Sequence, residues 1–205
     1  MGFYTDRILP KLISAGMNNK AMTKHRPRIP TLASGRVLEI GIGSGLNIPY
    51  YSTQVTHLFG LEPSAVLQAE AAERAATAGA PFPVDFLSTG AENIPLERAS
   101  VDCVVSTWTL CSIPDLDRAL IEVRRVLKPG GQLLFLEHGR APDITVARWQ
   151  DRLAPVFRGL AGCNPNRQID VSIEAAGFRF IDIERGYFDG PRFISWHFVG
   201  KATPA

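Results

Sequence analysis

The sequence predicts an α/β fold built around a mostly parallel sheet, and three observations support this. Short apolar runs that suit buried strands alternate along the chain with segments whose apolar residues recur at helical spacing. A glycine-rich turn, residues 41–45, follows the first run, as in strand-to-helix turns that bind nucleotide-like ligands. The length of 205 residues fits one such domain with a large core rather than two.

Each element has a local reason. The expected strands cover residues 36–40, 55–61, 84–87, 102–107, 132–136, 178–184 and 193–199. The expected helices cover residues 46–50, 65–78, 116–127, 146–160 and 169–176. Ser64 can cap the second helix, and Lys128-Pro129-Gly130-Gly131 ends the third. The last two strands lie too close in sequence for a crossover, so we expect them to be antiparallel.

The glycine turn selects between two kinds of ligand. Its spacing is G-x-G-x-G, whereas a dinucleotide fingerprint needs its third glycine where this chain has Leu46. Glu39, two residues before the turn, would repel a pyrophosphate but attract a ligand that carries an ammonium and a sulfonium. We therefore predict that S-adenosylmethionine binds here. The residues assigned to it first are Glu39, Gly41, Gly43 and Gly45.

A second acid stands about 23 residues further on, where the next apolar run ends. In a βαβ unit, a carboxylate at this separation accepts hydrogen bonds from ribose hydroxyls. Glu62 is therefore assigned to the cofactor together with Pro63, which follows it. The alternative is that the glycine-rich turn and the two acids belong to some other kind of α/β protein.

The E-x-G-x-G-x-G pattern resembles motif I of the class I S-adenosylmethionine-dependent methyltransferases. This resemblance implies a Rossmann-like, seven-stranded, mostly parallel sheet with an antiparallel last strand and helices on both faces. Residues 89–95 resemble the adenine-binding segment of these enzymes, which implies that Ala91 and Glu92 contact the cofactor. Thr107, at the end of the fourth expected strand, is assigned to the same site.

A narrower resemblance covers nearly all of the chain from residue 37 onward. Residues 110–112, 126–131, 137–138 and 162–164 follow the order found in the mammalian methyltransferase-like alkyl thiol methyltransferases and their bacterial relatives. This similarity implies methyl transfer to a small-molecule acceptor, with a thiol favoured. The alternatives are an N-methyltransferase acting on an amine or phospholipid headgroup, and a non-catalytic S-adenosylmethionine-binding protein.

The catalytic candidates lie where strands end. Glu137 and His138 follow the fifth strand, and an imidazole with a pKa near ~6.5 can act as a general base at neutral pH. The alternative is that both hold the strand-to-helix loop together. Cys111 follows the fourth strand and completes the catalytic set. The candidate pocket residues are Tyr4, Trp108, Cys163 and Asn164, although a plain loop is the alternative for the last two.

Residues 1–34 form a separate N-terminal segment, before a cofactor-binding domain of residues 35–205. Apolar residues at helical spacing predict an amphipathic helix, which we expect to act as a lid over donor and acceptor. A helix that packs only for stability, or one that touches a membrane surface, is the alternative.

Composition narrows the partners and the compartment. Basic residues are scattered, with a net charge of +2 and a pI near 8.5, so no nucleic-acid partner is expected. The three cysteines form no C-x-x-C pair and no metal-ligand spacing, so we predict no metal site and a reducing compartment. No apolar run has membrane-spanning length and no signal-peptide core begins the chain, which predicts a cytoplasmic protein. The oligomeric state stays open.

Overall fold

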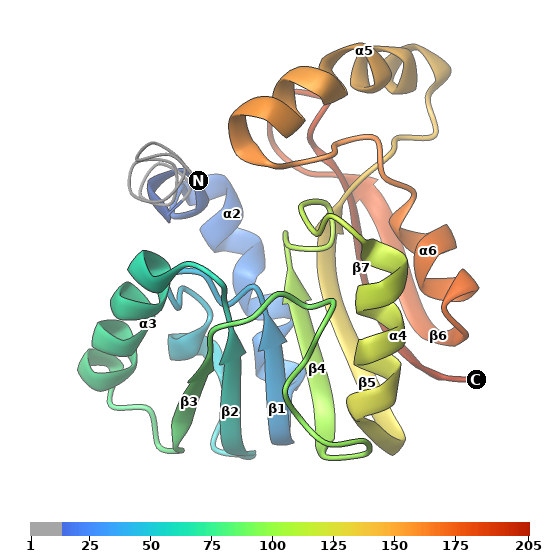
Figure 1. Ribbon diagram of the computed structural model, residues 1–205. Helices are drawn as coiled ribbons and strands as arrows, with labels where there is room; N and C mark the ends of the chain where they lie inside the picture. The colour runs from blue at the N-terminus through green and yellow to red at the C-terminus, as the bar shows by residue number, and fades with distance from the viewer. Residues whose placement is uncertain (1–13) are drawn as a thin grey trace.

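The computed structural model describes residues 14–205, and its centre is a seven-stranded sheet (Figure 1). The strands are β1 Gly35–Ile40, β2 Val55–Leu61, β3 Val84–Leu87, β4 Val101–Thr107, β5 Leu127–His138, β6 Phe178–Tyr187 and β7 Trp196–Pro204. Their order is β3-β2-β1-β4-β5-β7-β6, with β1 to β5 parallel and β7 antiparallel to both neighbours. The expected Rossmann-like sheet with an antiparallel last strand is confirmed.

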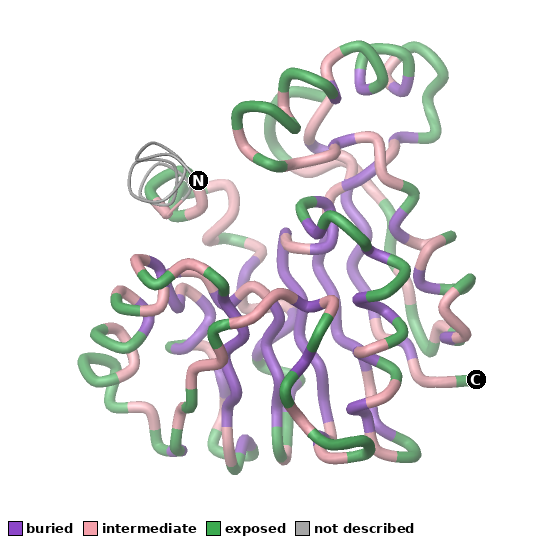
Figure 2. Tube along the Cα trace, viewed as in Figure 1, coloured by how far each residue is buried: buried purple, intermediate pink, exposed green. Residues whose placement is uncertain are grey.

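Helices lie on both faces of this sheet and, in the case of α5, beyond the carboxyl ends of its strands (Figure 1). They are α2 Lys20–His25, α3 Ala65–Ala78, α4 Leu116–Val126, α5 Ile144–Ala161 and α6 Ile169–Ala175, with 3₁₀ turns η2 Arg26–Arg28, η3 Pro30–Leu32 and η4 Ile48–Tyr50. α4 and α6 pack on one face, while α2, α3 and the 3₁₀ turns pack on the other. The central strands β1, β2 and β4 are almost wholly buried between these layers, whereas the edge strands β3 and β6 are partly exposed (Figure 2). Within residues 14–205, no helix is both long and apolar enough to cross a bilayer.

Local signals account for the boundaries of α3 and α4. The Ser64 side chain accepts a hydrogen bond from the backbone N–H of Leu67, and Gly79 ends α3 in the left-handed conformation at φ 60°. In the same way, the Asp115 side chain accepts from the N–H of Arg118 at the start of α4. These caps explain why both helices begin where the sequence indicates.

The predicted helix over residues 46–50 is wrong, because the chain forms only the single 3₁₀ turn η4 there. Pro49 has no N–H to continue a helix, and Tyr51 is already extended at φ −67° and ψ 137°. The glycine turn is therefore not followed by a long helix. Any ligand held there contacts the turn itself rather than the N-terminus of a helix.

The bounds of β5, β6 and β7 differ most from the prediction, and β6 runs on to Tyr187 instead of ending at residue 184. β5 begins at Leu127, directly after α4, so residues 128–131 belong to the strand instead of a separate turn. β7 begins at Trp196 and runs to Pro204, because it pairs with β5 on one side and β6 on the other. The carboxyl ends of the parallel strands still meet at one edge, and α5 lies beyond that edge (Figure 1).

Candidate active site

A cavity of about 310 Å³ lies at the carboxyl ends of β1, β2 and β4. Its walls include most of the residues assigned to the cofactor from the sequence: Glu39, Gly41, Gly43, Glu62, Pro63, Ala91, Glu92 and Thr107. Gly45 does not line it, since a Cβ there would point at Ile48 and Ala71, 2.8 and 3.0 Å away. The volume falls at the small end of the range typical of ligand sites.

The backbone of the glycine turn leaves open space where it faces the cavity. Gly43 has φ +55°, a conformation that costs a non-glycine residue energy, and a Cβ there would meet nothing closer than the Gly41 carbonyl oxygen at 3.9 Å. Gly41 is constrained differently, because its Cβ would lie 2.4 Å from the Thr109 side chain. The first glycine is needed for packing, and the second keeps the backbone open to a ligand.

Glu62 lies against this turn. One carboxylate oxygen accepts from the Gly43 N–H at 3.2 Å, and the other accepts from the Ser64 N–H at 2.9 Å. Burial raises the pKa of Glu62, while the two backbone hydrogen bonds oppose that shift. A carboxylate offers about four acceptor positions, so Glu62 keeps capacity for the two hydroxyls of a ribose.

Glu39 is the more deeply buried acid, with only 1% of its surface exposed. It accepts hydrogen bonds from Asn47 Nδ2 at 2.7 Å and from the Tyr51 hydroxyl at 2.8 Å. Burial raises its pKa to about 7, against the opposing effects of these hydrogen bonds and of the Arg26 charge. A carboxylate held this way in a cavity wall favours a cationic ligand, which would restore the charge balance.

Arg26 is the main residue of the cavity wall that the sequence did not reveal. It is 5% exposed, and it donates to Asn47 Oδ1 at 2.9 Å and to the Met17 carbonyl at 2.8 Å. Its guanidinium carbon lies 5.0 Å from the centre of the Trp108 ring. Ser14, Met17 and Arg26 all line the cavity, so the N-terminal segment contributes to its wall. Arg26 stands in a basic stretch without a motif, and no sequence signal marks it.

Asn47 and Tyr51 were missed for a different reason. Both follow the glycine turn closely, but their role depends on Glu39 being buried beside them, which the sequence does not specify. Asn47 Nδ2 also donates to the Thr107 hydroxyl at 2.9 Å, so one amide joins the ends of β1 and β4. Proximity to a cofactor turn is the signal that points to such residues.

Glu137 is fully buried, and its side-chain hydrogen bonds are with the end of β4 and with the loop after it. It accepts from Ser106 Oγ at 2.6 Å and from the backbone N–H groups of Thr109 and Leu110 at 3.0 and 3.1 Å. Burial raises its pKa to about 8. These contacts support the alternative reading, in which Glu137 holds the loop. It does not line the cavity.

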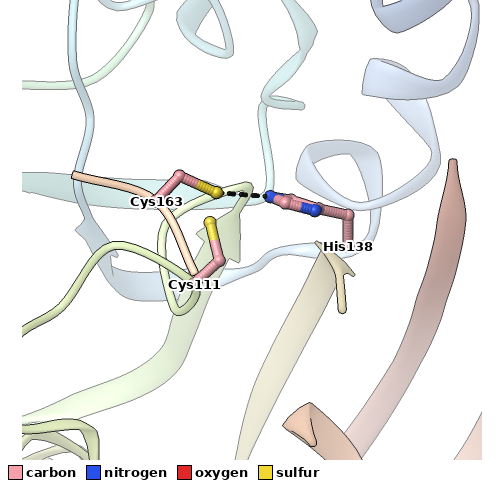
Figure 3. A group of neighbouring side chains, drawn as sticks. All are labelled: Cys111, His138 and Cys163. Atoms are coloured by element: carbon pink, nitrogen blue, oxygen red, sulfur yellow. Dashed lines mark hydrogen bonds between the residues drawn. The ribbon is translucent and has the colours of Figure 1, made fainter. Parts of the chain in front are cut away.

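Cys111, His138 and Cys163 converge from three separate segments (Figure 3). The two sulfur atoms and one ring nitrogen lie within 4.8 Å of one another, and Cys163 Sγ is 3.1 Å from His138 Nε2. Hydrogen bonding to Cys163 lowers the pKa of Cys111 well below its usual range, against the effect of burial. Folding thus brings together three possible ligand atoms that no short spacing in the sequence links, so the expectation of no metal site, which depends on spacing, stays a prediction.

The remaining candidate residues do not all lie in the same place. Trp108 lines the cavity, at φ +52°, whereas Cys111, His138, Cys163 and Asn164 do not. Asn164 turns toward the loop after β4, where its N–H and Nδ2 both donate to the Cys111 carbonyl, at 3.0 and 3.1 Å. His138 Nδ1 is buried and has no hydrogen-bond partner among the described residues. Tyr4 lies outside the described residues.

Comparison with known proteins adds homology to this geometry. The profile of a methyltransferase domain family matches residues 38–135. Human thiol S-methyltransferase TMT1B is 35% identical over 84% of this chain and 73% of its own length. Phosphatidylethanolamine N-methyltransferase of Cereibacter sphaeroides is 30% identical over 62% of this chain and 59% of its own. A SAM-dependent methyltransferase structure from Thermotoga maritima superimposes with a TM-score of 0.71 at 19% identity, covering 98% of this chain and 99% of that one.

The cavity suits the cofactor that this homology implies. Glu39 can face a positive charge, Glu62 can accept hydroxyl hydrogen bonds, and Gly43 leaves room for a close approach. The similarity to the thiol S-methyltransferases extends well beyond these residues, over most of the chain. The chain therefore belongs to the class I S-adenosylmethionine-dependent methyltransferases, and it is an enzyme that uses S-adenosylmethionine as its methyl donor.

Proposed function

We propose that the enzyme transfers the methyl group to the sulfur of a small-molecule thiol. The observation that carries this proposal is the similarity to thiol S-methyltransferases, which includes the segments around Cys111, His138 and Cys163 as well as the cofactor turn. The cavity wall supports it. Next to the glycine turn and the two acids, the lining contains the apolar residues Met17, Leu46, Trp108, Ile113, Pro114 and Ala161. An apolar wall suits an alkyl thiol better than a charged headgroup.

The chemistry requires alignment more than acid–base catalysis. Bound S-adenosylmethionine supplies a methyl carbon activated by its sulfonium, so transfer is an in-line displacement. Glu39 would hold the charged end of the cofactor, and Glu62 with the Gly43 turn would hold the ribose end. A thiol with a pKa near ~8.5 is partly ionised at neutral pH, so a strong base is unnecessary. The burial and hydrogen bonds of Glu137 agree with a mechanism in which this residue is not a base.

Residues 1–34 act in this proposal as a cover for the cavity. Ser14 supports the idea through its hydroxyl, which donates to Glu70 Oε2 at 2.8 Å and can accept from the Ser44 hydroxyl at 3.0 Å, within the glycine turn. Arg26 supports it from the other side through Asn47 and Trp108. Both contacts support a covering role for the described part of the segment, residues 14–34, which would exclude water from the donor.

The test is a panel of acceptors assayed side by side with the purified enzyme and S-adenosylmethionine. The panel contains alkyl and aryl thiols, primary amines, phenols and vesicles of phosphatidylethanolamine, and S-adenosylhomocysteine formation is the readout. We expect turnover with thiols. Turnover with amines or vesicles and none with thiols would instead support the second candidate, an N-methyltransferase, which the similarity to the Cereibacter sphaeroides enzyme favours. Cofactor binding without any turnover would point to a non-catalytic role.

A further inference from the structure

The Cys111, His138 and Cys163 group lies outside the cofactor cavity and has no role in the mechanism above. The residues come from the loop after β4, the end of β5 and the segment after α5. Figure 3 shows the two thiols and the imidazole pointing toward a common centre. Two sulfurs and one imidazole nitrogen are a set of ligands typical of thiophilic divalent cations.

The segment that carries Cys163 is fixed in place by hydrogen bonds. Asn164 donates twice to the Cys111 carbonyl, and its own Oδ1 accepts from Arg158 Nε at 2.8 Å. Arg167 donates to the carbonyls of Leu110 and Ile113, both at 2.6 Å. These bonds clamp the segment after α5 onto the loop after β4. These hydrogen bonds thus keep the two thiols close to each other even without a bound ion.

The distances suit a tetrahedral ion. Bonds of ~2.3 Å to sulfur and ~2.0 Å to nitrogen place tetrahedral ligand atoms roughly 3.5–4 Å apart. The three atoms of the cluster, all within 4.8 Å of one another and one pair at 3.1 Å, need only small rotations to reach that arrangement. Cys111 is 2% exposed and Cys163 is half-buried, so an ion can enter from the side of Cys163.

We propose that Cys111, His138 and Cys163 form a binding site for Zn²⁺, a site that goes beyond the proposed methyl transfer. Binding releases to solvent any protons that the two cysteines and the protonated imidazole still carry, because cysteine ligates as thiolate and histidine as neutral imidazole. Three protein ligands leave one coordination position for water or another small ligand. Ser112 and Ala161, close in sequence to the two cysteines, line the cofactor cavity, so the ion would tie together segments that shape its wall.

The test uses Co²⁺ as a spectroscopic substitute for Zn²⁺ on the full chain, reduced and then desalted under anaerobic conditions. We expect one equivalent of Co²⁺ to give near-ultraviolet absorption from thiolate-to-metal charge transfer together with visible bands of a tetrahedral site. Zn²⁺ should abolish both, and Zn²⁺ alone should raise the melting temperature, by an amount that grows with the logarithm of its free concentration above the dissociation constant. Neither readout requires a methyl acceptor or turnover, so failure here and failure of the proposed function are distinguishable.

Single substitutions test whether the ion is bound by these residues. Cys111→Ala and Cys163→Ala should each lose the charge-transfer absorption, while Cys103→Ala, which removes a buried thiol from β4, should keep it. Asn164→Ala should weaken Co²⁺ binding by about 10- to 100-fold, because it releases the loop that presents Cys111. Circular dichroism checks that each variant is folded.

Two results would overturn the site. One is the absence of thiolate absorption in the folded wild-type protein at excess Co²⁺. The other is absorption that survives in both Cys111→Ala and Cys163→Ala, since the ion would then be bound elsewhere. Asn164→Ala keeps the test decisive if either cysteine variant fails to fold, because its side chain does not bind the ion.

Discussion

Replacing Glu39 with glutamine isolates the effect of one buried charge. The two side chains have nearly the same shape, and the amide can satisfy the same neighbours. Its oxygen can accept from Asn47 Nδ2, and its nitrogen can donate to the Tyr51 hydroxyl, in place of the hydrogen bonds seen at 2.7 and 2.8 Å. The change therefore removes the charge while keeping the packing and the hydrogen-bond count.

The magnitude follows from the pKa of Glu39, which burial raises from 4.5 to about 7. Between these two pH values the folded chain holds a proton that the unfolded chain has lost, so the free energy of unfolding falls as pH rises. Each pKa unit corresponds to about 1.4 kcal/mol, which gives a penalty of about 3 kcal/mol above pH 7. At pH 5 the penalty is only about 1 kcal/mol.

We therefore expect cofactor-free Glu39→Gln to be more stable than the wild type at pH 8, and the gap to narrow toward pH 5. For a domain of this size, about 3 kcal/mol corresponds to roughly 6–12 °C in melting temperature. Melting of both proteins from pH 5 to 8 measures the gap. The gain in stability should come with a loss of function, because the same carboxylate attracts the cationic cofactor.

Cofactor binding gives the matching half of the test. A cation next to Glu39 favours the ionised form, so binding should release a proton below pH 7. The wild-type dissociation constant should then increase by up to about tenfold for each pH unit below 7. In Glu39→Gln, it should be larger at pH 8 and nearly independent of pH.

Isothermal titration in two buffers of different ionisation enthalpy counts the released proton. If Glu39→Gln is less stable at pH 8, with a melting profile parallel to the wild type, Glu39 carries no burial penalty. If wild-type affinity does not depend on pH, the carboxylate does not sense the cofactor charge. Either result refutes the electrostatic reasoning.

The remaining predictions concern the turn, the N-terminal segment and the core. Gly43→Val should abolish S-adenosylmethionine binding in calorimetry, whereas Gly79→Val, with φ +60° and open space but far from the cavity, should carry similar backbone strain and still bind. Binding by the Gly43 variant at wild-type affinity would contradict the turn's role. Arg26→Ala should weaken cofactor binding and reduce stability by about 1–3 kcal/mol, because it leaves the buried Asn47 Oδ1 without its hydrogen-bond donor; unchanged affinity would remove the N-terminal segment from the site. Leu120→Ala should cost about 2–5 kcal/mol in urea unfolding without changing cofactor affinity, and a smaller cost would mean that the core around α4 relaxes into the space.

Much of the fold was accessible from the sequence because its signals are local. The bounds of α3 and β3 match the prediction, since a capping serine, a terminal glycine and flanking prolines act within a few residues. β5 and β7 were placed less well, because their lengths depend on the strands that pair with them. A single sequence does not show that pairing.

The residues of the candidate site also differ in whether their signals are local. Glu39, Gly43 and Glu62 were found because their roles depend on short, fixed spacings beside one turn. Arg26 was not found, because its role arises only when a distant segment folds over that turn. The Cys111 and Cys163 pair is a further case, since it depends on hydrogen bonds that fasten the segment after α5 to the loop after β4.

Arg26 also has a consequence for how tightly the enzyme retains its cofactor. One guanidinium holds both the Met17 carbonyl and the amide of Asn47, which in turn bonds Glu39. Loading the cofactor and docking the first helices are then coupled equilibria, and such coupling acts equally in both directions. Proteolysis within residues 14–25 should slow when the cofactor is bound. By the same reciprocity, a binder that pulls residues 14–25 away from the domain should release the cofactor.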